Sequence, residues 1–156
     1  MRLTLIAMGR LRQSPELDLV HDYRTRFDRS GRGLGLGPLS MTELEDKKGG
    51  GKLAEAALIT KAIPKGAKII ALDEHGRGLT SPQFSTVLAG YRDQGVGDLA
   101  LIIGGADGLD ASVVDAADMT LSLGAMVWPH MLARVMICEQ LYRAASILAG
   151  SPYHRE

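Results

Sequence analysis

The chain has 156 residues, enough to bury a core of its own, and this length predicts a single domain over 1–156. The charges of its 18 basic and 18 acidic residues cancel, which excludes an overall electrostatic attraction of the chain to nucleic acid or membrane. One cysteine excludes an intrachain disulfide and a cysteine-rich metal site, and no apolar run approaches the roughly 20 residues that cross a bilayer. We expect a soluble, cytoplasmic domain.

Apolar runs and helix-start signals divide the chain into alternating strands and helices. Three helix starts carry a hydroxyl or carboxylate cap, two of them followed by proline: Ser14-Pro15, Ser81-Pro82 and Asp110. In chain order we expect a strand over 2–9, a helix over 15–31, a short strand over 36–41, a polar surface loop over 43–52, a helix over 53–63, a strand over 68–73, a turn over 74–80, a helix over 82–94, a strand over 98–103, a helix over 111–117, a strand over 119–123 and a helix over 129–150. This alternation, with apolar strands, predicts an α/β fold in which helices cover both faces of a parallel sheet.

The polar segment 43–52 contains the letters GGGK, which invite comparison with a phosphate-binding loop. The pattern G-x-x-x-x-G-K-[ST] is not met, because Asp46 occupies the place of its first glycine and Leu53 that of its hydroxyl. We therefore interpret the segment as a flexible surface loop.

Three strand ends form the candidate site. In open parallel sheets ligands bind beyond the carboxyl ends of the strands, here at 72–73, 103–105 and 123–124. Gly104 and Gly105 let the backbone turn sharply and approach a ligand closely. A tight strand-to-helix turn without a ligand is the alternative explanation of these glycines.

The segment 121–134, LSLGAMVWPHMLAR, places an apolar loop between a strand and a helix, whereas loops normally lie in water and are polar. We expect this loop to be covered by a ligand, another segment or a second subunit. The backbone of 123–128 could read an adenine edge while Leu123, Met126 and Val127 sandwich the ring. Packing under a dimer partner is the alternative.

The titratable residues form no nucleophile or metal constellation. The four histidines lack the H-x-x-x-H and H-E-x-x-H spacings of metal ligands, so we expect no metal. His130 follows Pro129 at a helix start, where a neutral imidazole could donate a hydrogen bond or serve a structural role. Cys138 falls inside the helical pattern, and we expect it to be a buried, small apolar residue.

The last helix is apolar over more than one narrow stripe and needs cover on two sides, for which we expect the sheet and a second subunit. Glu139 and Arg143 are spaced to pair on the remaining face. The tail residues Tyr153, His154 and Arg155 suit a nucleobase and its phosphate, although such a tail is ordinarily frayed. Six arginines make the first quarter of the chain locally basic: Arg10, Arg12, Arg24, Arg26, Arg29 and Arg32. They could form an RNA-facing patch, and a solvated helix face is the alternative.

Several segments, taken together, match the pattern of one protein family. They are LIIGGADGL at 101–109, LSL at 121–123, Pro129-His130, Arg134, EQLYRA at 139–144 and PYHRE at 152–156. In combination they resemble the ribosomal RNA large subunit methyltransferase H family of the SPOUT superfamily. With the start of the chain, 3–9, and its length, the resemblance covers essentially the whole sequence, and nothing is carried over to the polar loop 43–52.

The resemblance implies one SPOUT domain, a homodimer and a deep trefoil knot in the C-terminal part, roughly 68–156. Periodicity cannot reveal such a knot, since knots are nearly absent from proteins. The implied activity is S-adenosylmethionine-dependent methylation of N3 of a pseudouridine in large-subunit (23S) ribosomal RNA on the assembled ribosome. Carried over residue by residue, cofactor contacts fall on Leu72, Gly104, Leu123, Gly124, Ala125, Met126, Val127 and Trp128, and substrate contacts on Tyr153, His154 and Arg155.

The implied chemistry is in-line methyl transfer from a sulfonium to a ring nitrogen, for which the protein mainly supplies proximity and alignment. A neutral His154 or a bound water could take the N3 proton, and no residue is assigned as the base. Arg155 would hold a phosphate or stabilise charge on the uracil carbonyls. The alternatives are a SPOUT methyltransferase that acts on another RNA such as tRNA, and a non-enzymatic ribosome-binding factor.

Overall fold

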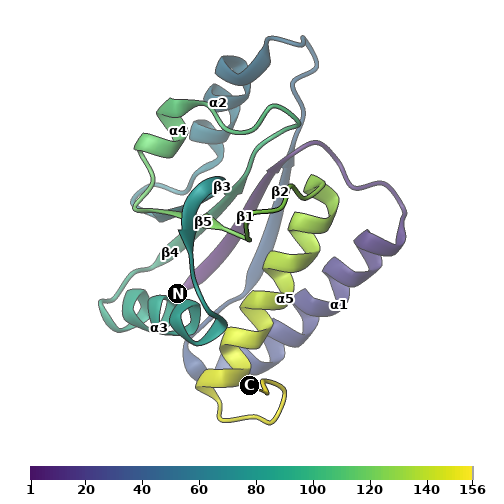
Figure 1. Cartoon of the computed structure of the whole chain (residues 1–156). Helices are drawn as coiled ribbons and strands as arrows, with labels where there is room; N and C mark the ends of the chain where they lie inside the picture. The colour runs from purple at the N-terminus through teal and green to yellow at the C-terminus, as the bar shows by residue number, and fades with distance from the viewer. Residues whose placement is uncertain (156) are drawn as a thin grey trace.

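The computed structural model describes residues 1–155 and is built on a five-stranded parallel sheet with the order β2-β1-β4-β3-β5 (Figure 1). The strands are β1 (Arg2–Met8), β2 (Leu39–Leu44), β3 (Lys68–Gly78), β4 (Asp98–Ile103) and β5 (Met119–Ser122). The helices are α1 (Pro15–Gly31), α2 (Gly51–Ala62), α3 (Ser81–Asp93), α4 (Ala111–Asp115) and α5 (His130–Leu148), with a 3-10 turn at Arg32–Leu34. The parallel α/β sheet expected from the alternating pattern is confirmed.

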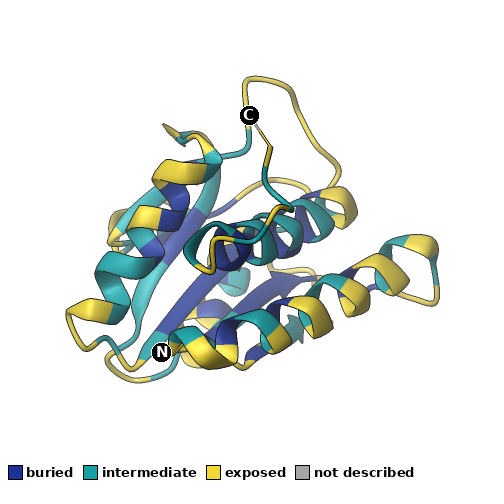
Figure 2. Cartoon of the chain, turned by 90° about the horizontal axis from the view of Figure 1, so that it is seen from below, coloured by how far each residue is buried: buried dark blue, intermediate teal, exposed yellow. Residues whose placement is uncertain are grey.

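Helices cover both faces of the sheet, as expected, and the strands between them are largely buried (Figure 2). Leu5 of β1 and Leu101 of β4 belong to the apolar core under α1, α3 and α5. Met8 and Ile102, on the same two strands, belong to the smaller core under α2 and α4. Successive side chains of a strand point to opposite faces, so apolar runs are needed where both faces are covered.

The strand expected over 36–41 begins at Leu39 instead. Gly37 has a positive φ of 99°, and Pro38 has no N–H to donate to a neighbouring strand, so the ladder with β1 begins after them. β2 then runs on through Leu44, so the first residues of the expected loop 43–52 are strand. α2 likewise begins at Gly51, two residues earlier than expected.

The turn expected over 74–80 is wrong, because β3 continues through most of it. Leu72 and Arg77 both pair with Leu121 of β5, so the residues between them protrude as a bulge. Gly76 permits the close approach, since a Cβ there would lie 2.8 Å from the backbone of Leu121 and Thr120. The polar residues of this bulge are what made the segment resemble a simple turn.

α3 is capped by Thr80, not by Ser81 as expected. Thr80 Oγ1 accepts the N–H of Gln83 at 3.3 Å, and Gln83 Oε1 accepts the N–H of Thr80 at 2.9 Å, which is a reciprocal capping box. The Ser81 hydroxyl instead donates to Gln140 Oε1 of α5 at 2.7 Å. This contact joins the start of α3 to the middle of α5.

The other helix starts agree with their expected caps. The Ser14 hydroxyl accepts the N–H of Leu17 at 3.2 Å, and the Asp110 carboxylate accepts that of Ser112 at 2.9 Å. α4 ends at Asp115, two residues before the expected end, and both ends of α5 lie within two residues of the expected 129–150.

α5 lies on one face of the sheet and packs against both α1 and α3 (Figure 1). These flanking helices supply much of the cover on the second side of α5, for which the sequence alone predicts another subunit. Ile137, Cys138 and Leu141 are fully buried, whereas Met131 and Leu132 in the first turn are 45% and 38% exposed. The part of α5 that needs an external cover is therefore its beginning, next to the apolar loop.

Candidate active site

The positions at which the sequence predicts three strands to end lie side by side at one edge of the sheet, although β3 continues past Leu72 to Gly78. Leu72 of β3 pairs with Ile103 of β4 on one side and with Leu121 of β5 on the other. Gly104 and Leu123 follow those partners by one and two residues. Because adjacent strands are about 4.8 Å apart, the three ends form one compact region roughly 10 Å wide.

The glycines of the turn after β4 have a packing role within the protein. A Cβ at Gly104 would lie 2.8 Å from the backbone of Gly108, which folds back over it. A Cβ at Gly105 would lie 2.9 Å from the carboxylate oxygens of Glu55 in α2. The tight turn therefore requires glycine at 104, whereas the flexible Glu55 side chain can move away from a Cβ at Gly105, and ligand binding by Gly104 stays a prediction.

A cleft of about 610 Å³ opens beside the end of β5, between α1, α3 and α5. Apolar side chains form most of its walls, among them Tyr23, Leu79, Phe84, Leu123 and Val135. Volumes of roughly 300–1,000 Å³ and mainly apolar walls are typical of small-molecule sites.

Polar groups enter this cleft from two helices: Ser81 and Gln83 from α3, and Glu139 and Gln140 from α5. Of the predicted cofactor residues, the structure brings Leu123 and Gly124 into the cleft walls. Leu72, Gly104 and 125–128 lie at the same edge of the sheet but are not part of the cleft walls.

The apolar loop 123–128 is exposed within the chain itself. Met126 is 72% exposed, Val127 84% and Trp128 41%. The Ser122 hydroxyl closes the turn by accepting the Gly124 N–H at 3.2 Å and donating to the Gly124 carbonyl at 3.1 Å. Residues 1–155 therefore do not bury this apolar loop completely. This agrees with the expectation that a ligand or a second subunit covers it.

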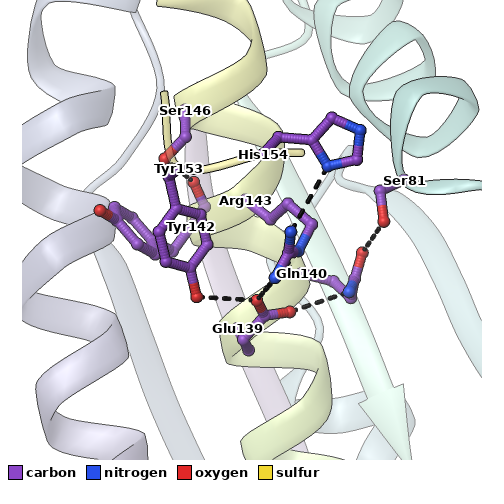
Figure 3. A network of polar contacts seen from close by, with 8 residues as sticks. All are labelled: Ser81, Glu139, Gln140, Tyr142, Arg143, Ser146, Tyr153 and His154. Atoms are coloured by element: carbon purple, nitrogen blue, oxygen red, sulfur yellow. Dashed lines mark hydrogen bonds and ion pairs between the residues drawn. The ribbon is translucent and has the colours of Figure 1, made fainter. Parts of the chain in front are cut away.

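The C-terminal tail packs back onto α5, so Tyr153 and His154 are not frayed, which was the alternative to a substrate-binding tail (Figure 3). The Tyr153 hydroxyl donates to Glu139 Oε1 at 3.0 Å, and the Tyr153 ring lies 4.6 Å from that of Tyr142, centroid to centroid. Burial and the hydrogen bond to Glu139 raise the pKa of Tyr153. His154 is half-buried, and Arg155 is exposed.

The expected pair of Glu139 and Arg143 is confirmed. Arg143 Nε and Nη2 donate to Glu139 Oε1 at 3.0 and 2.6 Å, and Gln140 Nε2 donates to Glu139 Oε2 at 2.8 Å. The hydrogen bond to Glu139 raises the pKa of Arg143. The two side chains are 17% and 24% exposed, so this is a partly buried network and not an ordinary surface pair.

Sequence reasoning missed the buried guanidinium of Arg134, which is 2% exposed. It donates to the carbonyls of Met8 and Gly9 at 2.6 and 2.9 Å and to Glu43 Oε1 at 2.9 Å. Burial lowers the pKa of Arg134, and the carboxylate of Glu43 acts in the opposite direction. The signal was present in the sequence, since Arg134 occupies the same helical face as the buried positions three, four and seven residues later.

The basic first quarter is only partly free for RNA. Arg24 Nε donates to the Leu39 carbonyl at 3.1 Å, and Arg26 pairs with Asp22 at 2.9 Å. Arg10 pairs loosely with Glu45 at 3.5 Å. The remaining three arginines of the set are exposed: Arg12, Arg29 and Arg32.

Cys138 is buried as expected, and burial raises the pKa of its thiol to about 12.

Within residues 1–155, no group of three or more His, Cys, Asp and Glu side chains is placed to hold a metal ion. In the same part of the chain, none of the helices has the length and apolar character needed to cross a membrane.

Comparison with known proteins agrees with the fold and extends over the whole chain. Residues 1–154 match a family model described as a predicted SPOUT methyltransferase. Two proteins named ribosomal RNA large subunit methyltransferase H, from Dinoroseobacter shibae and Roseobacter denitrificans, are each 65% identical over 155 residues, covering 99% of both chains. A protein of the same name from Paracoccus denitrificans is 56% identical over 156 residues, covering 100% of both chains.

The fold is also similar to that of a solved structure described as a probable methylase family protein from Haemophilus influenzae, with a TM-score of 0.50. That similarity covers 99% of this chain and 70% of the other at 14% identity, and it concerns the fold alone. The family model and the full-length relatives together show that the chain belongs to the SPOUT methyltransferase family.

Proposed function

We propose that this protein transfers a methyl group from S-adenosylmethionine to N3 of a pseudouridine in large-subunit (23S) ribosomal RNA on the assembled ribosome. The observation that carries the proposal is the 65% identity, over 99% of both chains, to relatives named ribosomal RNA large subunit methyltransferase H. The protein acts in the cytoplasm, as one SPOUT domain whose C-terminal part, roughly 68–156, is tied in a trefoil knot. Glu156, the last residue of that part, lies outside the described residues.

The edge of the sheet around β3, β4 and β5 fits a cofactor of this kind. The cofactor has a flat adenine with hydrogen-bonding edges, and the adjoining cleft has apolar walls and a volume typical of small-molecule sites. No atom lies within 4 Å of the position of a Cβ at Gly124, so the chain leaves open space there. The proposed contacts are Leu72, Gly104, Leu123, Gly124, Ala125, Met126, Val127 and Trp128.

S-adenosylmethionine supplies a methyl group on a sulfonium, which is already activated toward attack by a nucleophilic nitrogen. The protein therefore contributes alignment more than chemical activation. Backbone groups of 123–128 orient the cofactor, and the apolar side chains of Met126 and Val127 exclude water around it. Tyr153 and His154 position the target nucleotide, and the exposed guanidinium of Arg155 binds a phosphate.

The protein acts as a homodimer. Exposed apolar side chains follow one another from the loop into the first turn of α5: Met126, Val127, Trp128, Met131 and Leu132. A soluble monomer rarely leaves a contiguous apolar patch in water, and a second copy covers it in this proposal. Analytical ultracentrifugation tests this, with Val127→Glu as the variant expected to dissociate the dimer.

Methyl transfer tests the proposed activity. The purified protein is incubated with tritiated S-adenosylmethionine and assembled ribosomes, free large subunits or bulk tRNA, all from cells that lack the modification. We expect label in 23S RNA of assembled ribosomes, and mass spectrometry of the digested RNA should identify N3-methylpseudouridine. Label in tRNA instead would indicate a different RNA substrate, and ribosome binding without transfer would indicate a non-enzymatic factor.

A further inference from the structure

Two basic segments leave the same end of the sheet, one after β1 and one after β2 (Figure 1). The first is 9–13, GRLRQ, and the second is 45–52, EDKKGGGK, which runs into the first turn of α2. Together they carry five basic and two acidic residues in a chain of zero formal net charge, so positive charge is locally in excess. We call the five basic side chains the basic edge: Arg10, Arg12, Lys47, Lys48 and Lys52.

The fold holds these two segments side by side. They follow neighbouring parallel strands, and the Gly9 N–H donates to the Leu44 carbonyl at 2.7 Å just beyond the strand pairing. One residue further along each segment, Arg10 Nε lies 3.5 Å from Glu45 Oε2. The basic edge is therefore one surface to which both segments contribute.

Most of the cations on this surface lack an acidic partner. The Asp46 carboxylate accepts the backbone N–H groups of Lys48, at 3.1 Å, and of Gly50, which shapes the loop. Glu45 pairs only with Arg10, and an exposed pair of this length contributes little. The other four basic side chains are exposed and form no ion pair within residues 1–155. They remain available to an anionic partner.

The basic edge adjoins the proposed cofactor site in two places. Lys52 Nζ lies 3.9 Å from the position of a Cβ at Gly108, so the first turn of α2 reaches the turn after β4. Arg134 Nη2 donates to the Gly9 carbonyl at 2.9 Å, which holds the start of α5 against the segment after β1. α5 begins just after the loop 123–128. A strand of RNA that places one nucleotide at the proposed cofactor site can therefore extend across these cations.

We propose that the basic edge is an interaction surface for the phosphate backbone of the ribosomal RNA that flanks the target pseudouridine. Lysine and arginine side chains attract phosphates whatever the base sequence, and such contacts fix the position and register of the bound strand. A row of exposed cations suits a partner whose negative charges repeat along a chain. The inference rests on the proposed function, to which it adds a second RNA contact besides the tail.

The salt dependence of ribosome binding tests the contact with phosphates. The Kd for assembled ribosomes is measured by co-sedimentation between about 50 and 200 mM KCl. In Lys47→Gln/Lys48→Gln the Kd should rise roughly tenfold at the lower salt concentration, and the slope of log Kd against log salt should decrease by roughly 0.7 to 1 per lost contact. Arg12→Gln tests the other segment and should weaken binding in the same direction.

Lys61→Gln/Lys65→Gln is the matched control. It removes the same charge from exposed lysines at and just beyond the other end of α2. Its Kd and its salt slope should equal those of the parent protein. An unchanged slope in Lys47→Gln/Lys48→Gln, or equal effects in the two double variants, would overturn the inference.

Directed hydroxyl-radical cleavage distinguishes RNA from a ribosomal protein as the partner. An iron–EDTA reagent is coupled to Lys47→Cys, and the one native cysteine, Cys138, is fully buried and should stay unlabelled. We expect cuts in 23S RNA near the target pseudouridine, and none from a reagent coupled to Lys61→Cys. Absence of RNA cuts from bound, labelled Lys47→Cys would refute the contact with RNA and indicate a protein partner.

Methyl-transfer kinetics separate this inference from the proposed function. In Lys47→Gln/Lys48→Gln the KM for ribosomes should rise roughly tenfold, because contacts that bind the RNA are lost. The Kd for S-adenosylmethionine should stay within about twofold, since no proposed cofactor contact is altered. An inactive parent protein would refute the proposed function, whereas an active parent with the same KM in both double variants would refute only the role of the basic edge.

Discussion

Arg134 of α5 donates to Glu43 of β2 at 2.9 Å, an ion pair between residues 91 positions apart in the sequence. The side chains of Arg134 and Glu43 are 3% and 22% exposed. The same carboxylate oxygen accepts the Leu11 N–H at 2.6 Å, just after β1. One buried contact thus joins β1, β2 and the start of α5.

Removing the acid from this pair should destabilise the fold. Glu43→Ala leaves the buried guanidinium with only its two carbonyl acceptors, and the free energy of unfolding should fall by about 3 kcal/mol. Urea unfolding followed by circular dichroism measures this. Glu45→Ala is the control, because Glu45 is 42% exposed and pairs with Arg10 at 3.5 Å, and its loss should stay below about 1 kcal/mol. Equal losses in the two variants would contradict the structural role of the buried pair.

A large side chain at Gly124 should block the cofactor. Gly124 has a φ of 121° and open space around it, so tryptophan at this position would extend into the proposed adenine site. We expect Gly124→Trp to weaken S-adenosylmethionine binding by at least roughly a hundredfold, or about 2.8 kcal/mol, in calorimetric titration.

Backbone strain from a side chain at positive φ accompanies that substitution and needs its own control. Gly95 also has a positive φ, 78°, with open space around it, and it lies outside the proposed site. Gly95→Trp should cost about 1–2 kcal/mol of stability from the strain of a left-handed backbone and leave cofactor binding unchanged. Normal affinity in folded Gly124→Trp would mean that the cofactor binds elsewhere.

Deletion of the tail should separate substrate recognition from cofactor binding. A chain that ends at Pro152 loses Tyr153, His154 and Arg155, together with Glu156 outside the described residues. We expect calorimetry to give an unchanged Kd for S-adenosylmethionine and the methyl-transfer assay to give no product. The lost hydrogen bond from Tyr153 to Glu139 should cost about 1 kcal/mol in urea unfolding. Full activity of the shortened chain would eliminate the proposed role of the tail.

Asp118 should contribute to acid unfolding. Partial burial tends to raise the pKa of Asp118, but hydrogen bonds from Lys68 Nζ and the Ile69 N–H outweigh burial, so the pKa lies below its ordinary value. A carboxylate with a lowered folded-state pKa stabilises the fold fully above the unfolded-state pKa, about 3.9. That stability is lost as the pH falls through the folded-state pKa.

The corresponding variant is Asp118→Asn. It should be less stable than the parent protein at pH 7, and the difference should shrink as the pH drops below about 4. Urea unfolding from pH 7 to pH 2.5 measures the two curves. A constant difference over this range would show that the ionisation of Asp118 does not contribute.

The sequence by itself determined the elements whose signals are local. The apolar run 98–103 predicted β4 to the residue, and the caps at Ser14 and Asp110 predicted the starts of α1 and α4. The alternation of apolar strands with helices was enough to predict a parallel sheet covered on both faces, because the spacing of apolar residues is a local property of the sequence. The sequence likewise predicted that 72, 104 and 123 would lie close together, and they do, although β3 continues beyond 72.

Only the tertiary structure decided the features that depend on distant partners. β3 continues past its expected end because Leu121 of β5, which already pairs with Leu72, also pairs with Arg77. Arg134 can be buried because carbonyls of Met8 and Gly9 and the carboxylate of Glu43 converge on it. Hydrogen-bonding partners far along the chain cannot be read from the spacing of neighbouring residues.

The tail illustrates the same limit. The sequence left a substrate-binding tail and a frayed end as alternatives, because no local pattern links a terminal tyrosine to a helix ten or more residues earlier. In the folded chain, Glu139 and Tyr142 on α5 supply a hydrogen-bond acceptor and a ring contact at the place where the tail turns back. The residue types of the proposed substrate site were visible in the sequence, and their arrangement depended on the fold.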